Sequence, residues 1–325
     1  MRSILQAASK AGLKGIEICY NNLRYHAAEL CRRDSAEVSQ SDMLEAAKDV
    51  KKLCDELRLT IIVLQPFARY EGQVDDEKHK QMVGKFTEWL EIAHALGCNI
   101  IQMPSNWEQS DTTGDMDKIV ADITEIADLA LQQNPPVKIA YEAISWGTYI
   151  DLWEQSWEVI RRVNRENVGL CLDTFHIAGR VWADPTSDTG RTSNGNAELV
   201  SSLTKLVKDV DVSKIFYVQL SDAEKLSGPL VEGHDFYEEG QPARMSWSRN
   251  ARLFPCEESL GGCMPVLTIA RAIVNGMGYR GWISMEVFSR HLLGDDHGIP
   301  VEFAWRAMRS YKRVREALEW DALFL

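Results

Sequence analysis

The sequence contains no apolar run long enough to cross a bilayer. Its longest apolar runs, such as Thr60–Leu64, are far shorter than the ~18 residues that a membrane-spanning helix needs. Basic residues are also scarce, with 36 Lys+Arg against 48 Asp+Glu and a formal net charge of −12. Nucleic-acid binders and proteins that bind anionic lipids both need clustered basic residues. The sequence therefore argues against nucleic-acid and membrane partners.

The seven cysteines form no C-x-x-C pair and no cluster with histidine at the spacing of zinc ligands. An odd, scattered set of cysteines is typical of a reducing compartment. The N-terminal bases Arg2, Lys10 and Lys14 faintly resemble a transit peptide, but Leu5 and Leu13 suit the apolar face of an ordinary helix. We therefore expect a cytoplasmic protein.

Short apolar runs alternate with amphipathic helical stretches along almost the whole chain, a pattern that predicts a parallel sheet covered by helices. The seven expected strands are Gly15–Cys19, Thr60–Gln65, Asn99–Met103, Val137–Glu142, Val168–Asp173, Ile215–Leu220 and Trp282–Val287. An open doubly wound sheet is the alternative, but its usual glycine-rich turn does not follow the first strand. We predict an α/β fold, a TIM (β/α)8-type barrel lacking its first strand, as a single domain over residues 1–325.

Two segments break the regular spacing. Residues 183–197 are rich in Ser, Thr, Gly and Asn and predict a mobile surface loop. The segment from Leu220 to Met264 predicts a long lid loop between the last two strands. Three arginines and a tryptophan in this lid favour ligand recognition over disorder: Arg244, Trp247, Arg249 and Arg252.

Four expected strands carry an oxygen-bearing side chain at or near the C-terminal end: Glu142, Asp173, Gln219 and Glu286. In a barrel of parallel strands these ends meet on the face where active sites are built. Clustered carboxylates repel one another unless a cation neutralises them. Three carboxylates and an amide favour Mg²⁺ or Mn²⁺ over Zn²⁺. The sequence therefore predicts a divalent-metal site able to stabilise an enediolate.

Two further residues lie near these strand ends. His176 follows Asp173 by three residues and is a candidate general base, with a purely structural role as the alternative. Arg69 follows the strand Thr60–Gln65, and its guanidinium suits a bidentate clamp on a carboxylate. The alternative for Arg69 is a surface ion pair with Glu71 or Asp75.

Longer segments of the chain resemble a known family. They are GLKGIEICYNNL, LQPFARYEG, YEAISWGT, CLDTFHIAGRVWADP, YVQLSDAEKL, EGQPARMSWSRNARLF and GYRGWISMEVF. These segments resemble the sugar-phosphate isomerase/epimerase superfamily of xylose isomerase-like TIM barrels. The lid motif GQPARMSWSRNARLF further resembles the 3-dehydroshikimate dehydratases of the fungal quinate-degradation type. Family members have a strand ahead of the first helix, which this chain lacks.

The resemblance implies a hydro-lyase that converts 3-dehydroshikimate to protocatechuate and water through a metal-stabilised enediolate. It places the metal ligands at Glu142, Asp173, Gln219 and Glu286, in agreement with the residue pattern. It also implies that His176, Arg69 and Glu142 act in catalysis. The residues expected to bind a small anionic substrate are Arg69, Ser248, Arg249 and Arg252.

Three other functions are alternatives to this one, and the residue pattern argues against two of them. An isomerase or epimerase acting on a sugar or hydroxy acid would use the same metal site. A non-catalytic binding barrel would not need competent ligands at all four positions. An apurinic-site endonuclease would need a histidine-rich multi-zinc site and a basic groove, and the sequence shows neither. A homo-oligomer is compatible with the sequence, because cyclic dimers are the commonest oligomers.

Overall fold

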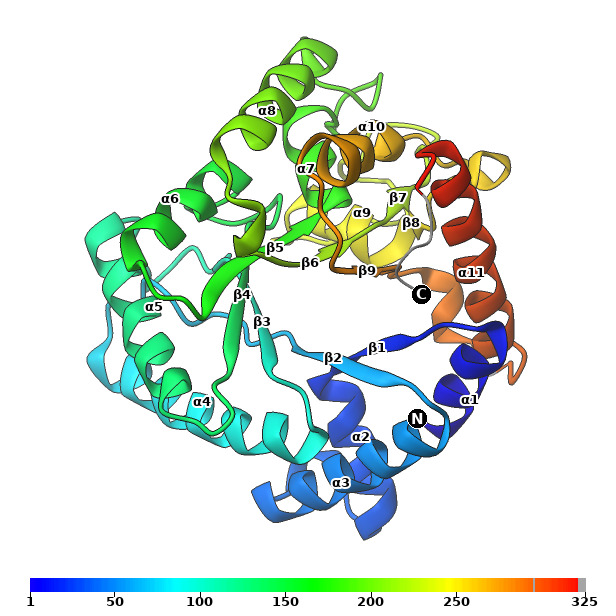
Figure 1. Ribbon diagram of the computed structural model, residues 1–325. Coiled ribbons are helices and arrows are strands. Elements are labelled where there is room, and N and C mark those ends of the chain that lie inside the picture. Colours follow the sequence, from blue (N-terminus) through cyan, green and yellow to red (C-terminus); the bar gives the residue numbers. More distant parts are fainter. Residues whose placement is uncertain (295, 321–325) are drawn as a thin grey trace. The chain divides into compact units, whose positions relative to one another are not determined.

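The computed structural model describes residues 1–294 and 296–320. They divide into two compact units, and the chain passes between the units more than once. Unit 1 comprises Met1–Glu142 and Glu158–Leu170, and unit 2 comprises Ala143–Trp157 and the chain from Cys171 onwards. Figure 1 shows the chain coloured from the N-terminal helix α1 to the C-terminal helix α11.

Unit 1 is built on parallel strands that pair in chain order. They are β1 (Gly15–Cys19), β2 (Thr60–Gln65), β3 (Ile100–Pro104), β4 (Lys138–Glu142) and the first half of β5 (Val168–Asp173). The helices are α1 (Arg2–Ala11), α2 (Tyr20–Cys31), α3 (Gln40–Glu56), α4 (Asp76–Leu96) and α5 (Met116–Leu131). Helices α3, α4 and α5 follow one another along one side of these strands (Figure 1).

The strands of unit 1 form where near-continuous apolar residues can be buried on both faces. Every residue of β3 is buried, and Val63 and Leu64 of β2 are fully inaccessible. Helix α3 begins at a capping box in which Ser39 and Asp42 satisfy each other's backbone amides. The apolar face of α3 then packs against the unit's core, as the amphipathic pattern predicts.

Unit 2 contains the second half of β5 and the parallel pair β6 (Ile215–Gln219) and β9 (Trp282–Ser284), with Gln219 opposite Ser284. The strand order β5-β6-β9 continues the order of the earlier strands. A short antiparallel pair joins β7 (Asp222–Ala223) to β8 (Arg252–Leu253). The longer helices are α7 (Thr174–Val181), α8 (Gly195–Asp209), α9 (Ala243–Ala251) and α11 (Ile299–Ala317), with the six-residue α10 (Val266–Arg271). Helix α6 (Trp153–Val163) has residues in both units.

All seven expected strands are confirmed, three of them with the predicted bounds: β1, β2 and β5. The last strand is shorter than predicted, because β9 ends at Ser284 and leaves Glu286 two residues beyond it. Within the described residues, no strand precedes β1. No helix in this part of the chain is long and apolar enough to cross a membrane. The single-domain organisation over residues 1–325 stays a prediction.

The expected lid between β6 and β9 is a long segment in which the nine-residue helix α9 and the short β7–β8 pair are set among turns. Helix α9 begins after Pro242, whose fixed φ suits a helix start. Arg252 and Leu253 then pair with β7, so the helix ends where a strand begins. The sequence did not reveal α9 because its apolar periodicity is weak and polar residues are buried on it.

Candidate metal and substrate site

Asp173 ends β5 and also caps the next helix. Its Oδ1 accepts a hydrogen bond of 2.7 Å from the backbone amide of Phe175, which fixes the carboxylate at the start of α7. Its Oδ2 lies 2.6 Å from Nη1 of Arg252. Both side chains are almost completely buried. A buried charge of this kind needs a close partner, and the guanidinium supplies one.

Arg252 connects most of the polar side chains of unit 2 that the sequence singled out. Besides Asp173, its Nη1 donates to Oε2 of Glu286 at 2.8 Å, and its Nε donates to Oγ of Ser248 at 2.9 Å. The guanidinium carbon lies 4.3 Å from the ring centre of Phe175. Among the lid arginines predicted to face a substrate, Arg252 is therefore the one that reaches the carboxylates.

Gln219 and Glu286 lie together at the ends of their strands. The amide Nε2 of Gln219 donates to Oε1 of Glu286 at 2.8 Å, and its Oε1 accepts from the Cys171 thiol at 3.3 Å. Ser221, two residues past β6, accepts from Nη1 of Arg252 at 3.0 Å and donates to Asp173 at 3.3 Å. Unit 2 thus brings together Asp173, Gln219 and Glu286, three of the four predicted metal ligands.

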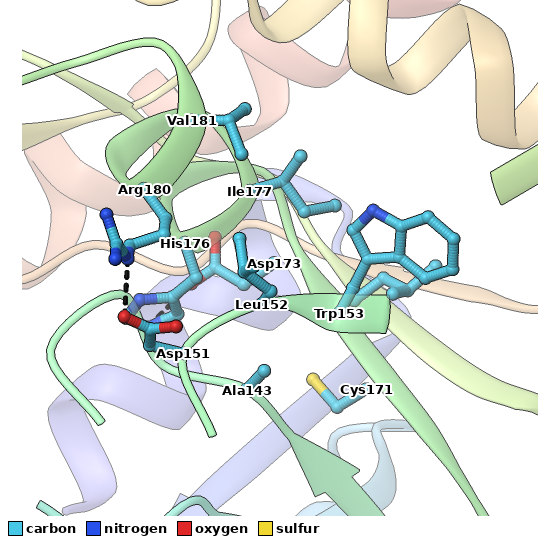
Figure 2. Close-up of a pocket in the computed structure, with 11 residues that line it drawn as sticks. Ala143, Asp151, Leu152, Trp153, Cys171, Asp173, His176, Ile177, Arg180 and Val181 are labelled. Atoms are coloured by element: carbon cyan, nitrogen blue, oxygen red, sulfur yellow. Dashed lines mark hydrogen bonds and ion pairs between the residues drawn. The ribbon is translucent and has the colours of Figure 1, made fainter. Parts of the chain in front are cut away.

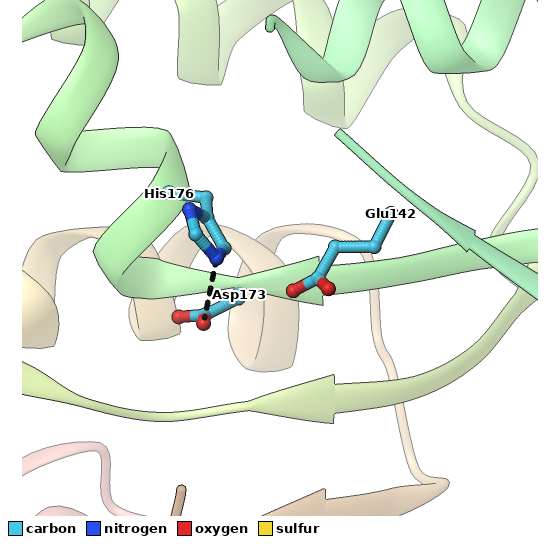
Figure 3. A group of neighbouring side chains, drawn as sticks. All are labelled: Glu142, Asp173 and His176. Carbon is cyan, nitrogen blue, oxygen red and sulfur yellow. Dashed lines mark ion pairs between the residues drawn. The ribbon is translucent and has the colours of Figure 1, made fainter. Parts of the chain in front are cut away.

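His176 lies in the first turn of α7, with its imidazole turned toward the carboxylate of Asp173 (Figure 3). Two N–H donors approach the ring: the Ser145 amide at 3.0 Å from Nδ1, and Nη2 of Arg252 at 3.0 Å from Nε2. Burial lowers the pKa of His176 to about 3, and the charge of Arg252 acts in the same direction while Asp173 opposes it. The imidazole is therefore neutral at physiological pH.

Glu142 is the last residue of β4 in unit 1, and its side chain is buried. It lies opposite Pro104 in the parallel register, and Nε2 of Gln102 donates to its Oε2. The backbone amide of Ser105 donates to the carbonyl of Glu142 at 2.8 Å, which extends the pairing past the end of β3. Figure 3 labels Glu142 at the end of its strand. Strand pairing within unit 1 thus fixes the backbone that carries this carboxylate.

Arg69 lies in unit 1 with its backbone in the left-handed region, at φ 65°, which costs a non-glycine residue on the order of 1 kcal/mol. Its guanidinium lies 5.2 Å from the ring centre of Trp107 and 3.9 Å from Oε1 of Glu108, and about half of the side chain is exposed. The alternative ion pair with Glu71 or Asp75 is replaced by this contact with Glu108. The predicted substrate contact of Arg69 stays a prediction.

The other lid arginines do not reach the cluster in unit 2. Arg249 is exposed and donates to Oε1 of Gln241 at 2.5 Å. Arg244 donates to the carbonyl oxygens of Gly179 and Ala183 near the end of α7. Ser248 lies in the last turn of α9 and Arg252 follows the helix directly as its extended C-cap, where its Nε reaches Oγ of Ser248.

A small pocket lies behind His176 and Asp173 in unit 2 (Figure 2). Its volume is about 10 Å³, which is close to the room needed for one water molecule. Arg180 closes one side of it through an ion pair with Asp151. The pocket is therefore too small for a ring-shaped substrate, and His176 and Asp173 form part of its wall.

Sequence reasoning missed three contributors to this cluster. Ser221 lies two residues past the end of β6, so its position near a strand end was an available signal. Phe175 lies under the Arg252 guanidinium, and the Ser145 amide contacts the His176 ring. Neither role could be found from the sequence, because backbone donors and ring contacts leave no residue pattern.

Comparison with known proteins places the chain among α/β barrels. The family model described as xylose isomerase-like TIM barrel matches residues 5–320. A 3-dehydroshikimate dehydratase of Neurospora crassa is 43% identical over 319 residues, which cover 97% of this chain and 89% of that protein. A 3-dehydroshikimate dehydratase of Pseudomonas aeruginosa is 28% identical over 285 residues, covering 88% of this chain and 36% of that protein.

A solved structure described as IOLI protein with a binding zinc atom has a similar fold. The TM-score is 0.65 with 19% sequence identity, and the match covers 98% of this chain and 94% of that one. At this identity the comparison bears on the fold alone, and it agrees with the match to the family model.

Proposed function

Because the chain belongs to the xylose isomerase-like TIM-barrel family, we propose that it converts 3-dehydroshikimate to protocatechuate and water with a bound divalent metal ion. It is a hydro-lyase-type enzyme similar to 3-dehydroshikimate dehydratases, as its identity to the Neurospora protein over most of both chains shows. The metal dependence and the roles of individual residues are the parts that we propose.

The contact between Arg252 and two carboxylates carries the metal proposal. One cationic atom, Nη1 of Arg252, lies within hydrogen-bond distance of both Asp173 Oδ2 and Glu286 Oε2. These oxygens therefore already converge on a position that suits a positive charge, and the guanidinium stands in for a cation there. Divalent Mg²⁺ or Mn²⁺ prefers such oxygen donors.

We propose Asp173, Glu286, Gln219 and Glu142 as the metal ligands. The Gln219 amide already lies against Glu286, and it would ligate through its Oε1 in place of Nε2. Glu142 and Asp173 are residues of the type that can hold a metal ion, and each lies at the end of a parallel strand. A bound divalent ion supplies a Lewis acid for the negative charge that develops on substrate oxygens.

Arg252 and Ser248 are the proposed contacts for the substrate carboxylate. A guanidinium has five N–H donors, so Arg252 can hold a carboxylate in bidentate fashion once its Nη1 is released by a competing cation. Ser248 then keeps the Nε end of the guanidinium in place. We propose that the exposed Arg249 and Arg69 attract the anion toward the site without fixing its orientation.

His176 is the proposed residue for proton transfer. The Ser145 amide and Nη2 of Arg252 both present N–H groups to the ring, and a neutral imidazole can accept only one of them; the backbone amide fixes Nδ1 as the acceptor at 3.0 Å. Nε2 faces Arg252 and the Asp173 carboxylate, and it is the nitrogen that we propose exchanges a proton with the substrate. The proton on C4 is acidic because it is α to the C3 ketone, and the C5 hydroxyl leaves with a proton as water to give a cyclohexadienone. Loss of a C6 proton and protonation of O3 then give the aromatic ring.

The experiment that tests the proposal is direct. Purified protein is depleted of metal, loaded with Mg²⁺ or Mn²⁺, and mixed with 3-dehydroshikimate while the ultraviolet absorbance of protocatechuate is followed. We expect product from the loaded protein and a large loss of rate in the depleted protein. The competing isomerase function predicts no aromatic product from 3-dehydroshikimate. Well-folded, metal-loaded protein that forms no protocatechuate would exclude our proposal.

A further inference from the structure

A second cavity lies within unit 2, with a volume of about 650 Å³. Its walls are the segment 185–193 after α7, the segment 225–228 after β7, Trp247 of α9, and Cys263. We call the contacting side chains described above the Asp173–Arg252 cluster: Asp173, His176, Gln219, Ser221, Ser248, Arg252 and Glu286. None of the residues of the Asp173–Arg252 cluster lines this cavity. The volume is within the range of small-molecule sites, which is roughly 300–1,000 Å³.

Two cations, Arg191 and Lys225, and one carboxylate, Asp188, line this cavity in a protein with a net charge of −12. In residues 1–294 and 296–320, neither of them is found within 4.0 Å of a carboxylate. Burial and the nearby Asp222 raise the pKa of the Cys263 thiol to about 12, while Arg191 and Lys225 both act to lower it. The two cations are therefore close to the same wall residue, and their charges add in the cavity.

The position of Arg191 is fixed by its own loop. Its backbone amide donates to Oγ of Ser187 at 3.0 Å, and Ala183 pairs with Arg191 as an antiparallel bridge. These two interactions hold the backbone of Arg191 in place. The guanidinium lies 4.4 Å from the ring centre of Trp182. This segment was predicted to be a mobile loop, but its hydrogen bonds present the cation to the cavity in a defined place.

Helix α9 connects this cavity with the cluster around Arg252. Trp247 lines the cavity, donates from Nε1 to the carbonyl of Glu224 at 2.9 Å, and lies 5.3 Å from the ring of Phe175. The next residue, Ser248, accepts from Nε of Arg252. A molecule packed against Trp247 therefore contacts the same helix that holds the guanidinium.

We propose that this cavity is a second binding site for a small organic anion, held by Arg191 and Lys225 through a carboxylate or phosphate and packed against Trp247. Binding orders helix α9 and so acts on the position of Arg252. The inference is independent of the proposed reaction, because binding is measured without turnover. Its ligand class follows from a lining with two cations against the single carboxylate of Asp188, together with a tryptophan and hydroxyl side chains.

The test is isothermal titration calorimetry of the full chain with benzoate and, separately, with inorganic phosphate. The variant is Arg191→Ala with Lys225→Ala, and the control is Lys205→Ala with Lys208→Ala, which removes the same charge from the exposed face of α8. We expect the variant to bind at least about tenfold more weakly, as the loss of charged hydrogen bonds implies, while the control binds like the wild type.

The two probes distinguish the carboxylate from the phosphate as the group recognised, and a selective loss of either one in the variant supports the site. Hydrogen exchange of residues 243–251 should slow when the anion binds to the wild type and not in the variant. The proposal is overturned if neither anion binds at millimolar concentration, or if wild type, variant and control bind equally. Both double variants should keep the basal activity, because none of the four residues contacts the Asp173–Arg252 cluster.

Discussion

The Nη1 atom of Arg252 lies 2.6 Å from Oδ2 of Asp173, although 79 residues separate the two in the chain. The same nitrogen lies 2.8 Å from Oε2 of Glu286. Strand β5 ends at Asp173 and strand β8 begins at Arg252, so both backbones are fixed by secondary structure. The contribution of this buried contact to the free energy of unfolding can be measured by removing the guanidinium.

Arg252→Ala should lower the free energy of unfolding by about 3–5 kcal/mol, the usual cost of removing one partner of a buried charge pair. Urea unfolding measures the change, and Arg249→Ala is the control because its exposed side chain should contribute within about 0.5 kcal/mol. Added Mn²⁺ should raise the unfolding midpoint more in Arg252→Ala than in the wild type. Equal stability of the variant and the wild type without metal would contradict this prediction.

Asp173→Asn should weaken divalent-metal binding by at least about 100-fold, because a direct ligand matters more than residues around it. Asn caps helices about as well as Asp, so the start of α7 should be kept. Calorimetry with Mn²⁺ measures the affinity, and Glu198→Gln on the exposed face of α8 removes one charge as the control. Unchanged metal affinity in Asp173→Asn would remove this residue from the proposed ligand set.

His176→Ala should reduce kcat about 10²- to 10⁴-fold, the range expected for loss of a general acid or base. The measurement is the rate of protocatechuate formation at saturating substrate and metal. His297→Ala is the matched control, because this histidine is exposed. A loss of less than about tenfold in His176→Ala would exclude proton transfer by this residue.

Glu71 predicts a specific dependence of stability on pH. Its carboxylate is buried and accepts from the Asn106 amide and the Tyr141 hydroxyl, but burial dominates and raises its pKa to about 7. A raised carboxyl pKa means that the folded state holds the proton more tightly than the unfolded state. The stability from Glu71 is therefore present below about pH 4.5 and is lost as the pH rises to about 7, by up to about 3 kcal/mol.

Glu71→Gln should remove this dependence, since glutamine keeps the acceptor oxygen and does not ionise. Urea unfolding of both proteins at intervals from pH 4.5 to 8 gives the comparison. We expect the difference in unfolding free energy between variant and wild type to change in favour of the variant across this interval. Two parallel curves would show that Glu71 does not titrate near pH 7 in the folded protein.

The strands were predictable because a parallel strand buried on both faces needs a short apolar run. The run from Val168 to Asp173 shows this, since all six residues are buried and both bounds are as predicted. The strand predicted from Trp282 to Val287 is too long, because Met285 and Val287 are apolar side chains that lie beyond its end. They pack against the buried Phe254 and Phe303 and take no part in the strand.

The carboxylates and amide of the site were predictable from their places at strand ends, whereas their partners were not. Arg252 was one of three lid arginines, and only the formation of α9 decides which of them is directed inward. The sequence also suggested Glu71 or Asp75 as an acidic partner of Arg69, but the guanidinium lies 3.9 Å from Glu108, and the backbone of Arg69 has a positive φ that the sequence did not indicate. Both outcomes depend on backbone geometry that residue types alone do not specify.

The buried guanidinium has a consequence for how the protein matures. Arginine stays charged at every pH at which proteins fold, so Arg252 offsets one of the two negative charges of Asp173 and Glu286 from within the chain. At the proposed metal site the fold would therefore not depend on the ion, unlike in zinc fingers, where the ion itself drives folding. An incoming ion has to displace a competitor that is tethered to the same chain and is never diluted. The affinity of the proposed site for a metal ion would thereby be set partly by an arginine that need not be a ligand.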